Sequence, residues 1–247
     1  MSQLIVDEVM LREPNLLVPG KKPVGMVKID WSHPLTRGLR TAILYDGLSL
    51  SPHFIYDDIG GFAWENGGIL SGADTHGKYQ TSAGINRFIS TKTFSNIGLV
   101  DGVTCLSVVS FKITSVDIGL FGSTSTVPQV FLDTSGGNLR LALYTGTASV
   151  YSSVEYSSAQ YLQCAYSINA ITDIGNSYVN GKQTHDDVGI GTSAMAGAIE
   201  FAGASTKSGL LNNSNSQVYS SFLWKGILSN SELQSLSLDP YQFLIPA

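Results

Sequence analysis

The sequence predicts an all-β protein: a sandwich of two antiparallel sheets, preceded by an extended N-terminal arm and closed by one short helix. Three observations support this fold class. Apolar and polar residues alternate with a period of two along many short runs, 26 of the 247 residues are glycine, and only 13% are charged. Alternation is the pattern of half-buried strands, and a helical bundle would need many more charged and alanine residues on its exposed faces.

Residues 1–27 are expected to form the extended arm, and residues 28–247 a single globular domain. The arm contains three prolines: Pro14, Pro19 and Pro23. Proline fixes φ and lacks a backbone donor, so this segment is neither a helix nor a central strand.

The arm also contains the apolar run Leu16, Leu17 and Val18, which a purely solvated linker would not need. We expect these residues to anchor the arm on a neighbouring subunit. The alternative is a frayed tail with one docked segment.

Alternating strands follow the arm. Val27, Ile29 and Trp31 form one run, and residues 39–45 form another that ends at Asp46-Gly47. Residues 102–114 are apolar on both faces, which predicts a central strand covered on both sides. Trp31 and Trp224 are expected in the core because both fall in apolar strand patterns.

Two hairpins are predicted in the second half. Residues 129–146 alternate on both sides of a Ser-Gly-Gly-Asn turn, and residues 176–186 contain Asn180-Gly181. That dipeptide is typical of a type I′ turn, in which both central residues need positive φ. Further strands are expected within residues 160–170, 197–206 and 216–228.

One helix is expected near the C-terminus. Ser229 lies three residues before Glu232, which is the spacing of a capping box. Leu233 and Leu236 would share one face, and Pro240 would end the helix.

Charge and cysteine content exclude several classes. A net charge of −5 argues against nucleic acid as a partner. We find no secretory signal and no apolar run long enough for a membrane span. Cys105 and Cys164 lie in apolar alternating runs and are expected as buried free thiols, with a single disulfide as the alternative.

The order of several motifs resembles the laminin-G-like, concanavalin A-like jelly rolls. The motifs are "HPLTRGLRTAILYDG", "YVNGK", "IEFAGAS" and "LSNSELQSLSLDPYQFL". The resemblance covers roughly residues 28–245 and implies a jelly-roll sandwich. The terminal motifs "WSHPLTRGL" and "DPYQFL" are similar to proteins encoded by tailed bacteriophages, many of which are structural.

The resemblance implies a non-enzymatic bacteriophage virion protein, either a capsid decoration or a part of the tail or fibre, anchored by its arm. Its partners would be other virion proteins and further copies of itself, with a trimer as one expected form. It would be made in the host cytoplasm and reside in the virion. The first alternative is a carbohydrate-binding adhesin that attaches to host glycans, and the second is a glycoside hydrolase.

Catalytic motifs argue for the non-enzymatic interpretation. Glucanases of this superfamily carry two carboxylates on one strand, and no Glu of this chain has an Asp two residues later. Catalytic carboxylates could still meet from separate strands. His33, His53, His76 and His185 have no Gly-x-Ser-x-Gly motif beside them and are expected on the surface or in turns.

No cofactor is expected as a requirement, but two kinds of ligand site have candidate residues. Sugar rings stack on exposed aromatic side chains, and the candidates are Trp64, which glycines flank, and Tyr79. Calcium is the candidate cofactor, because it prefers carboxylate oxygens in loops. Its candidate ligands are Asp173, Asp186 and Asp187. The alternatives are a core position for Trp64 and solvated turn positions for the acidic residues.

Overall fold

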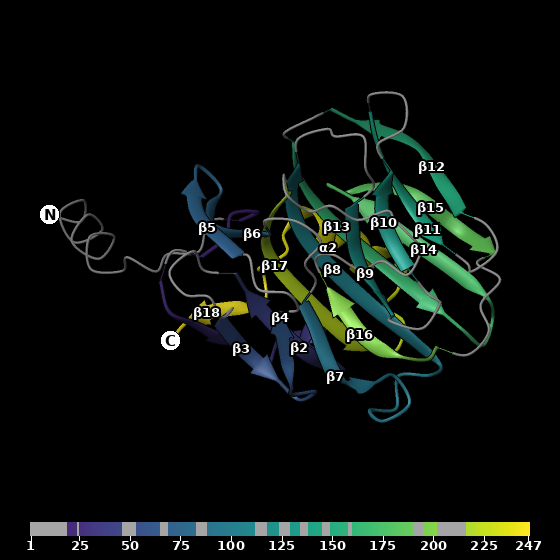
Figure 1. The fold of residues 1–247 in the computed structure, drawn as a ribbon, viewed down its shortest axis with the longest axis horizontal. Coiled ribbons are helices and arrows are strands. Elements are labelled where there is room, and N and C mark those ends of the chain that lie inside the picture. The colour runs from purple at the N-terminus through teal and green to yellow at the C-terminus, as the bar shows by residue number, and fades with distance from the viewer. Residues whose placement is uncertain are drawn as a thin grey trace, which may run out of the picture.

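The computed structural model describes residues 19–23, 25–45, 53–64, 69–82, 88–111, 118–123, 129–133, 138–144, 149–157, 160–189, 195–201 and 216–247. They form two stacked antiparallel sheets, and Figure 1 shows β7, β9, β10 and β16 of one sheet in front of β8, β13 and β17 of the other. The predicted all-β sandwich is confirmed.

The first sheet has seven strands. In spatial order they are β12 (Ser149–Tyr156), β11 (Leu139–Tyr144), β10 (Gln129–Asp133), β9 (Ile118–Ser123), β16 (Ala198–Phe201), β7 (Phe88–Thr93) and β4 (Phe62–Trp64).

The second sheet has nine strands. Seven follow one path: β15 (Lys182–Gly189), β14 (Ile174–Val179), β13 (Tyr161–Asn169), β8 (Gly102–Phe111), β17 (Ser216–Lys225), β2 (Leu39–Leu44) and β3 (His53–Asp57). The hairpin of β5 (Ile69–Asp74) and β6 (Gly77–Ser82) joins this sheet through β17.

The main core lies between the two sheets. Its side chains come from alternate positions of facing strands, such as Val130 and Leu132 of β10 and Cys105 of β8. Cys105 and Cys164 are both buried free thiols in this core, as expected. Burial raises the pKa of both thiols, because the charged thiolate loses its hydration there.

A second core covers the outer face of the nine-stranded sheet. Trp224 and Phe222 of β17 pack there under the C-terminal segment, which includes Leu233, Leu236 and Phe243. The covering elements are helix α2 (Asn230–Leu238), β18 (Leu244–Pro246), the 3-10 helix η1 (Pro34–Thr36) and β1 (Val27–Ile29), which pairs with β18. Because both its faces are covered, β8 is the buried central strand that its sequence predicts.

Local turn and cap chemistry agrees with the sequence. Asn180 and Gly181 have φ of 50° and 78°, as a type I′ hairpin requires. The Ser229 hydroxyl accepts a hydrogen bond from the Glu232 amide, and the Glu232 carboxylate accepts one from the Ser229 amide. The predicted capping box therefore starts α2.

The described end of the predicted arm is docked on the sandwich of its own chain. The Gly20 amide donates to Asp239, and the Gln163 side chain donates to the Gly20 carbonyl. The Lys22 side chain is 4% exposed, and its ammonium group donates to the carbonyls of Tyr45 and Lys78. Leu16, Leu17 and Val18 lie outside the described residues, so the anchoring role assigned to them stays a prediction.

Trp31 is not a core residue, contrary to expectation. Its side chain is 57% exposed, whereas Trp224 is fully buried as predicted. The alternation of Val27 and Ile29 stops at Asp30, whose carboxylate accepts hydrogen bonds from the Ser32 amide and hydroxyl. This turn rotates Trp31 out of the strand pattern.

None of the helices in the described part of the chain combines the length and apolar character that crossing a membrane requires.

Candidate functional site

A pocket of about 220 Å³ opens at the end of the sandwich where the chain crosses from β7 to β8. We call it the rim pocket. Its chemistry comes from Asp101, Asn169, Ile171, Lys225, Gly226 and Ile227, with Gly98 and Gly102 beside them. They belong to three chain segments: the loop before β8, the β13–β14 turn and the end of β17.

Backbone hydrogen bonds hold these three segments together. The Ala170 amide donates to the Asp101 carbonyl, and the Gly226 amide donates to the Gly102 carbonyl. The Thr104 hydroxyl donates to the Gly226 carbonyl and accepts from the Leu228 amide. The walls of the rim pocket are therefore fixed in place before any ligand arrives.

The rim pocket combines apolar walls with charged and amide groups. Ile171 is 74% exposed and Ile227 is 42% exposed, so both present apolar surface to solvent. Asp101 supplies a carboxylate and Lys225 an ammonium group. The side-chain Oδ1 of Asn169 accepts from the backbone amides of Ile171 and Thr172, which leaves the side-chain Nδ2 as a donor.

The backbone requires glycine at one position of the pocket lining. Gly226 has φ of 91°, a conformation that L side chains rarely adopt, and a Cβ there would meet nothing within 4 Å. Sequence reasoning missed this site because its residues come from segments about 60 residues apart. The one local signal for this site was the Lys225-Gly226 pair, at which a buried alternating strand ends.

The two predicted sugar-binding aromatics lie on different sheets. Trp64 ends β4 at the edge of the seven-stranded sheet, whereas Tyr79 lies on β6 of the nine-stranded sheet. The Tyr79 ring is half-buried, and its centroid lies 5.8 Å from that of Tyr219. The structure therefore does not bring Trp64 and Tyr79 into one site.

The predicted calcium ligands make separate local contacts. Asp187 accepts a hydrogen bond from the Asn176 side chain, and Asp186 accepts one from Gln183. Asp173 occupies the β13–β14 turn with φ of 59°. Within the described ranges, no three His, Cys, Asp or Glu side chains are grouped so that they could hold a metal ion.

His185 is buried, contrary to the expectation of a surface or turn histidine. It lies on β15 with 3% exposure. Its Nδ1 lies 2.7 Å from the Ser177 hydroxyl, and its Nε2 lies 3.2 Å from the Val150 carbonyl of β12. A carbonyl can only accept, so Nε2 carries the proton and Nδ1 accepts from Ser177. His185 thereby links the two sheets.

Stability should depend on pH through His185. Burial lowers the pKa of His185 below the ordinary histidine value of 6.5, so the folded state keeps the imidazole neutral while the unfolded state takes up a proton. The stability that comes from burying the neutral His185 imidazole should therefore be fully present above pH 6.5. The free energy of unfolding should fall as the pH drops below 6.5, by at most about 1.4 kcal/mol per pH unit.

Chemical denaturation of the wild type and His185→Gln between pH 5 and 8 measures this effect. The His185→Gln variant should lose stability at pH 8 and show a flatter profile below pH 6.5. Equal slopes in the two proteins would contradict the assignment.

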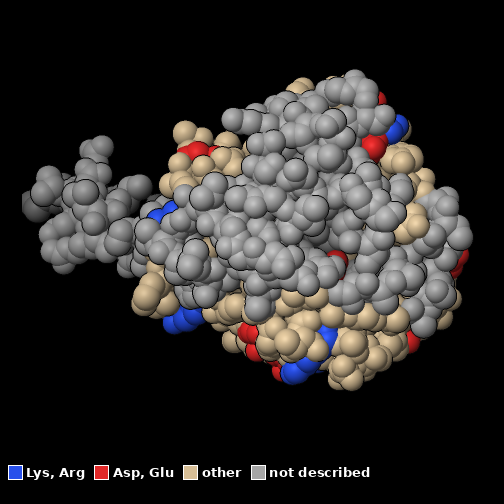
Figure 2. All heavy atoms as spheres, in the orientation of Figure 1, with Lys and Arg blue, Asp and Glu red and all other residues tan. Residues whose placement is uncertain are grey.

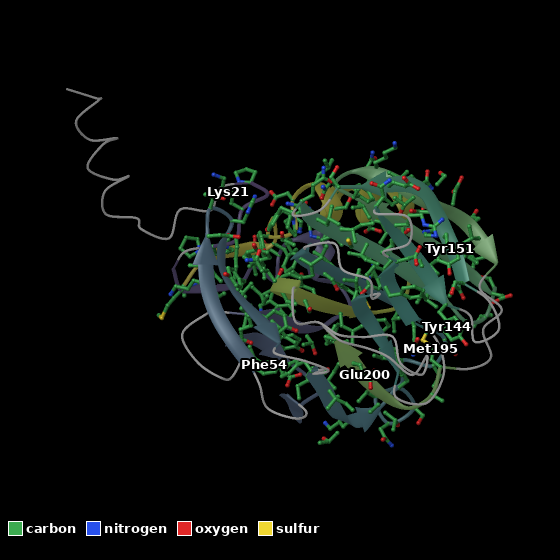
Figure 3. All side chains as sticks on the ribbon, turned by 45° about the horizontal axis from the view of Figure 1, so that its top comes forward. Lys21, Phe54, Tyr144, Tyr151, Met195 and Glu200 are labelled. Carbon is green, nitrogen blue, oxygen red and sulfur yellow. The ribbon has the colours of Figure 1, made fainter. Side chains whose placement is uncertain are left out.

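Carboxylates from separate strands share the outer face of the seven-stranded sheet. Ile199 and Phe201 point into the core, so Glu200 between them points to the opposite face of the sheet, and the same reasoning places Asp133 there; both side chains are buried. Figure 3 shows Glu200 on β16 to one side of Tyr144 and Tyr151.

Asp133 is paired with Arg140, whose guanidinium lies 4.5 Å from the centre of the Tyr151 ring. The Asp133 hydrogen bond raises the pKa of Arg140. Strand spacing and rise put the backbones of Asp133 and Glu200 about 17 Å apart. Their side chains would have to lean toward each other to approach the roughly 5–9.5 Å between the carboxyl groups of glycosidases, and that of Asp133 is held by Arg140 instead.

Comparison with known proteins shows similarity of fold. No family model and no curated protein sequence matches the chain. Among solved structures, Trypanosoma rangeli sialidase matches 98% of this chain with a TM-score of 0.62 and 13% identity. Domain 4 of a GH43 extracellular arabinanase from Geobacillus stearothermophilus, in complex with arabinotriose, matches 81% with a TM-score of 0.56 and 16% identity. The binding domain of Paraclostridial Mosquitocidal Protein 1 matches 82% with a TM-score of 0.59 and 12% identity.

The fold is a β-sandwich shared with these domains. The match covers 39% of the sialidase, 98% of the arabinanase domain and 52% of the toxin domain. The chain thus spans about two fifths of the sialidase.

These comparisons correct the expectation of a protein without enzymatic activity. It is contradicted by the matches to a sialidase and to a domain of an arabinanase, two proteins whose names denote action on glycans. The absence of a Glu-x-Asp motif was too narrow a criterion, because it covers carboxylates on one strand only.

Proposed function

We propose that this chain binds glycans and holds one sugar unit in the rim pocket. The observation that carries the proposal is the combination of two exposed isoleucines with a carboxylate, an amide and an ammonium group in one small, fixed cavity. A sugar ring has apolar C–H faces and a rim of hydroxyls, so it needs both kinds of contact.

The size of the rim pocket also supports a small polar ligand. Its volume of about 220 Å³ is below the roughly 300–1,000 Å³ of pockets that enclose drug-sized molecules. The fold likeness to an arabinanase domain solved with arabinotriose is consistent with this class of ligand.

Charge at the rim pocket favours a neutral or weakly charged ligand. In Figure 2 the described Lys, Arg, Asp and Glu side chains on the visible face form small scattered groups and no broad patch of one sign. At the rim pocket itself, Asp101 and Lys225 carry opposite charges. Neutral sugar hydroxyls can donate to the Asp101 carboxylate and accept from the Lys225 ammonium group.

Calorimetric titration with glucose-, xylose- and arabinose-based oligosaccharides tests the proposal. Lys225→Met keeps the aliphatic stem but loses the ammonium donor, so it should weaken binding at least about tenfold. Ile171→Ala should weaken binding about three- to tenfold by removing apolar contact, and its 74% exposure means that the fold should tolerate the change.

Met26→Ala is the matched control, because Met26 is also an exposed apolar side chain, at 70%, and does not line the rim pocket. It should bind like the wild type. Oligosaccharide binding that all of these variants retain would remove the rim pocket from the proposal. No binding to any glycan on a broad array would remove the function itself.

The setting of this glycan binding is a further part of the proposal. The terminal motifs that resemble tailed-phage proteins favour a virion component that attaches to host-surface glycans. Lys22 and Gly20 tie residues 19–23 to the sandwich, so any anchor formed by residues 1–18 would start from a fixed point. Detection of the chain in purified phage particles would support this setting.

A further inference from the structure

Trp31 forms an exposed aromatic surface with Tyr56, and neither residue lines the rim pocket. The Trp31 side chain is 57% exposed, and its ring centroid lies 4.8 Å from that of Tyr56 at an interplanar angle of 81°. Tyr56 lies on β3, at the edge of the nine-stranded sheet, and is itself partly buried against the outer core.

The turn that carries Trp31 is held by several contacts. Asp30 accepts hydrogen bonds from the amide and hydroxyl of Ser32, and the His33 amide donates to the Asp30 carbonyl. The Thr36 hydroxyl donates to the His33 carbonyl. The indole of the buried Trp224 donates to the Leu35 carbonyl and so fixes the segment after the turn.

A fixed, solvent-facing indole loses little conformational freedom when it binds a ligand. Three polar residues close to Trp31 in the sequence are exposed: Lys28, Ser32 and Arg37. A ligand for this surface must therefore offer an apolar face to the ring and hydrogen-bonding groups to the neighbours. A pyranose ring does both.

We propose that Trp31 and Tyr56 form a second glycan-contacting surface, on which a sugar ring stacks against the indole. This proposal rests on the proposed glycan-binding function and extends it from one sugar unit to an oligosaccharide.

The chain connects the new surface with the rim pocket. Seven residues after Trp31, the Gly38 carbonyl accepts from the amide of Lys225, whose side chain lines the rim pocket. Seven residues span at most about 24 Å. One oligosaccharide of several units can therefore reach from the rim pocket to Trp31, whereas a monosaccharide occupies the pocket alone.

The test is titration of the full chain and of Trp31→Ala with sugars of one to six units from the glucose, xylose and arabinose series. Trp31→Ala should weaken binding of the longest oligomer about three- to tenfold and leave binding of the monomer unchanged. Trp31→Phe, which keeps an aromatic face, should restore most of the lost affinity. Indole fluorescence should change on addition of the hexamer and not of the monomer.

Tyr151→Ala is the matched control, because Tyr151 is an exposed aromatic, at 42%, on β12 of the other sheet. It should bind every oligomer like the wild type. Equal affinities of Trp31→Ala and the wild type at all lengths would overturn the second surface while leaving the rim pocket intact. Loss of self-association in Trp31→Ala with unchanged sugar binding would also overturn it, since it would assign the surface to a second copy of the chain.

Discussion

Trp224→Ala is expected to lower the free energy of unfolding by about 3–5 kcal/mol, the usual cost of deleting a fully buried large aromatic side chain. Trp224 is fully buried in the outer core, and its indole donates to the Leu35 carbonyl at 2.6 Å. The change would therefore leave both a cavity and an unpaired carbonyl. Urea denaturation monitored by far-UV circular dichroism measures the loss.

Trp31→Ala is the control for this prediction, because it removes the same side chain from an exposed position. It should cost less than about 1 kcal/mol. Trp224→Phe, which keeps part of the packing, should fall between the two variants. Similar losses for Trp31→Ala and Trp224→Ala would contradict the assignment of one tryptophan to the surface and the other to the core.

Lys22→Met should destabilise the protein by about 2–4 kcal/mol. The aliphatic stem of Lys22 would be largely preserved, but the two carbonyls of Tyr45 and Lys78 would lose a charged donor in a buried position. Each unsatisfied buried polar group costs about 1–3 kcal/mol. Thermal unfolding and limited proteolysis of residues 19–30 should both report the loss.

Lys21→Met provides the comparison, since the neighbouring lysine is exposed and its replacement should change stability by less than about 0.5 kcal/mol. Figure 3 shows Lys21, next to the docked Lys22 in sequence, far from Tyr151 at the other end of the molecule. If both lysine variants were equally stable, Lys22 would not be the residue that docks this segment.

Local patterns predicted most of the fold. Three predictions depend only on neighbours in sequence, and all three were confirmed. They are the strand β8 with apolar residues on both faces, the Asn180-Gly181 turn and the capping box at Ser229. Turns and caps are short-range interactions, so the chain itself specifies them.

Long-range contacts could not be predicted in the same way. The docking of Lys22 depends on carbonyls 23 and 56 residues away, and the burial of His185 depends on β12 packing over β15. Trp31 was wrongly predicted as a core residue, because the hydrogen bond from Ser32 to Asp30 forms a turn that ends the alternation of the strand just before Trp31. The rim pocket escaped prediction because Asp101, Asn169 and Lys225 meet only when three strand ends align.

The pairing of β1 with β18 determines how the molecule would respond to mechanical force. Val27 pairs with Pro246 and Ile29 with Leu244, so the start of β1 and the end of β18 lie side by side at one end of a two-stranded ribbon. A load applied to the outer ends of the two strands, once the contacts of Gly20 and Lys22 have broken, would separate the ribbon one hydrogen bond at a time instead of shearing all its bonds together. The β1–β18 pair would therefore separate at low force, while the two large sheets remained folded.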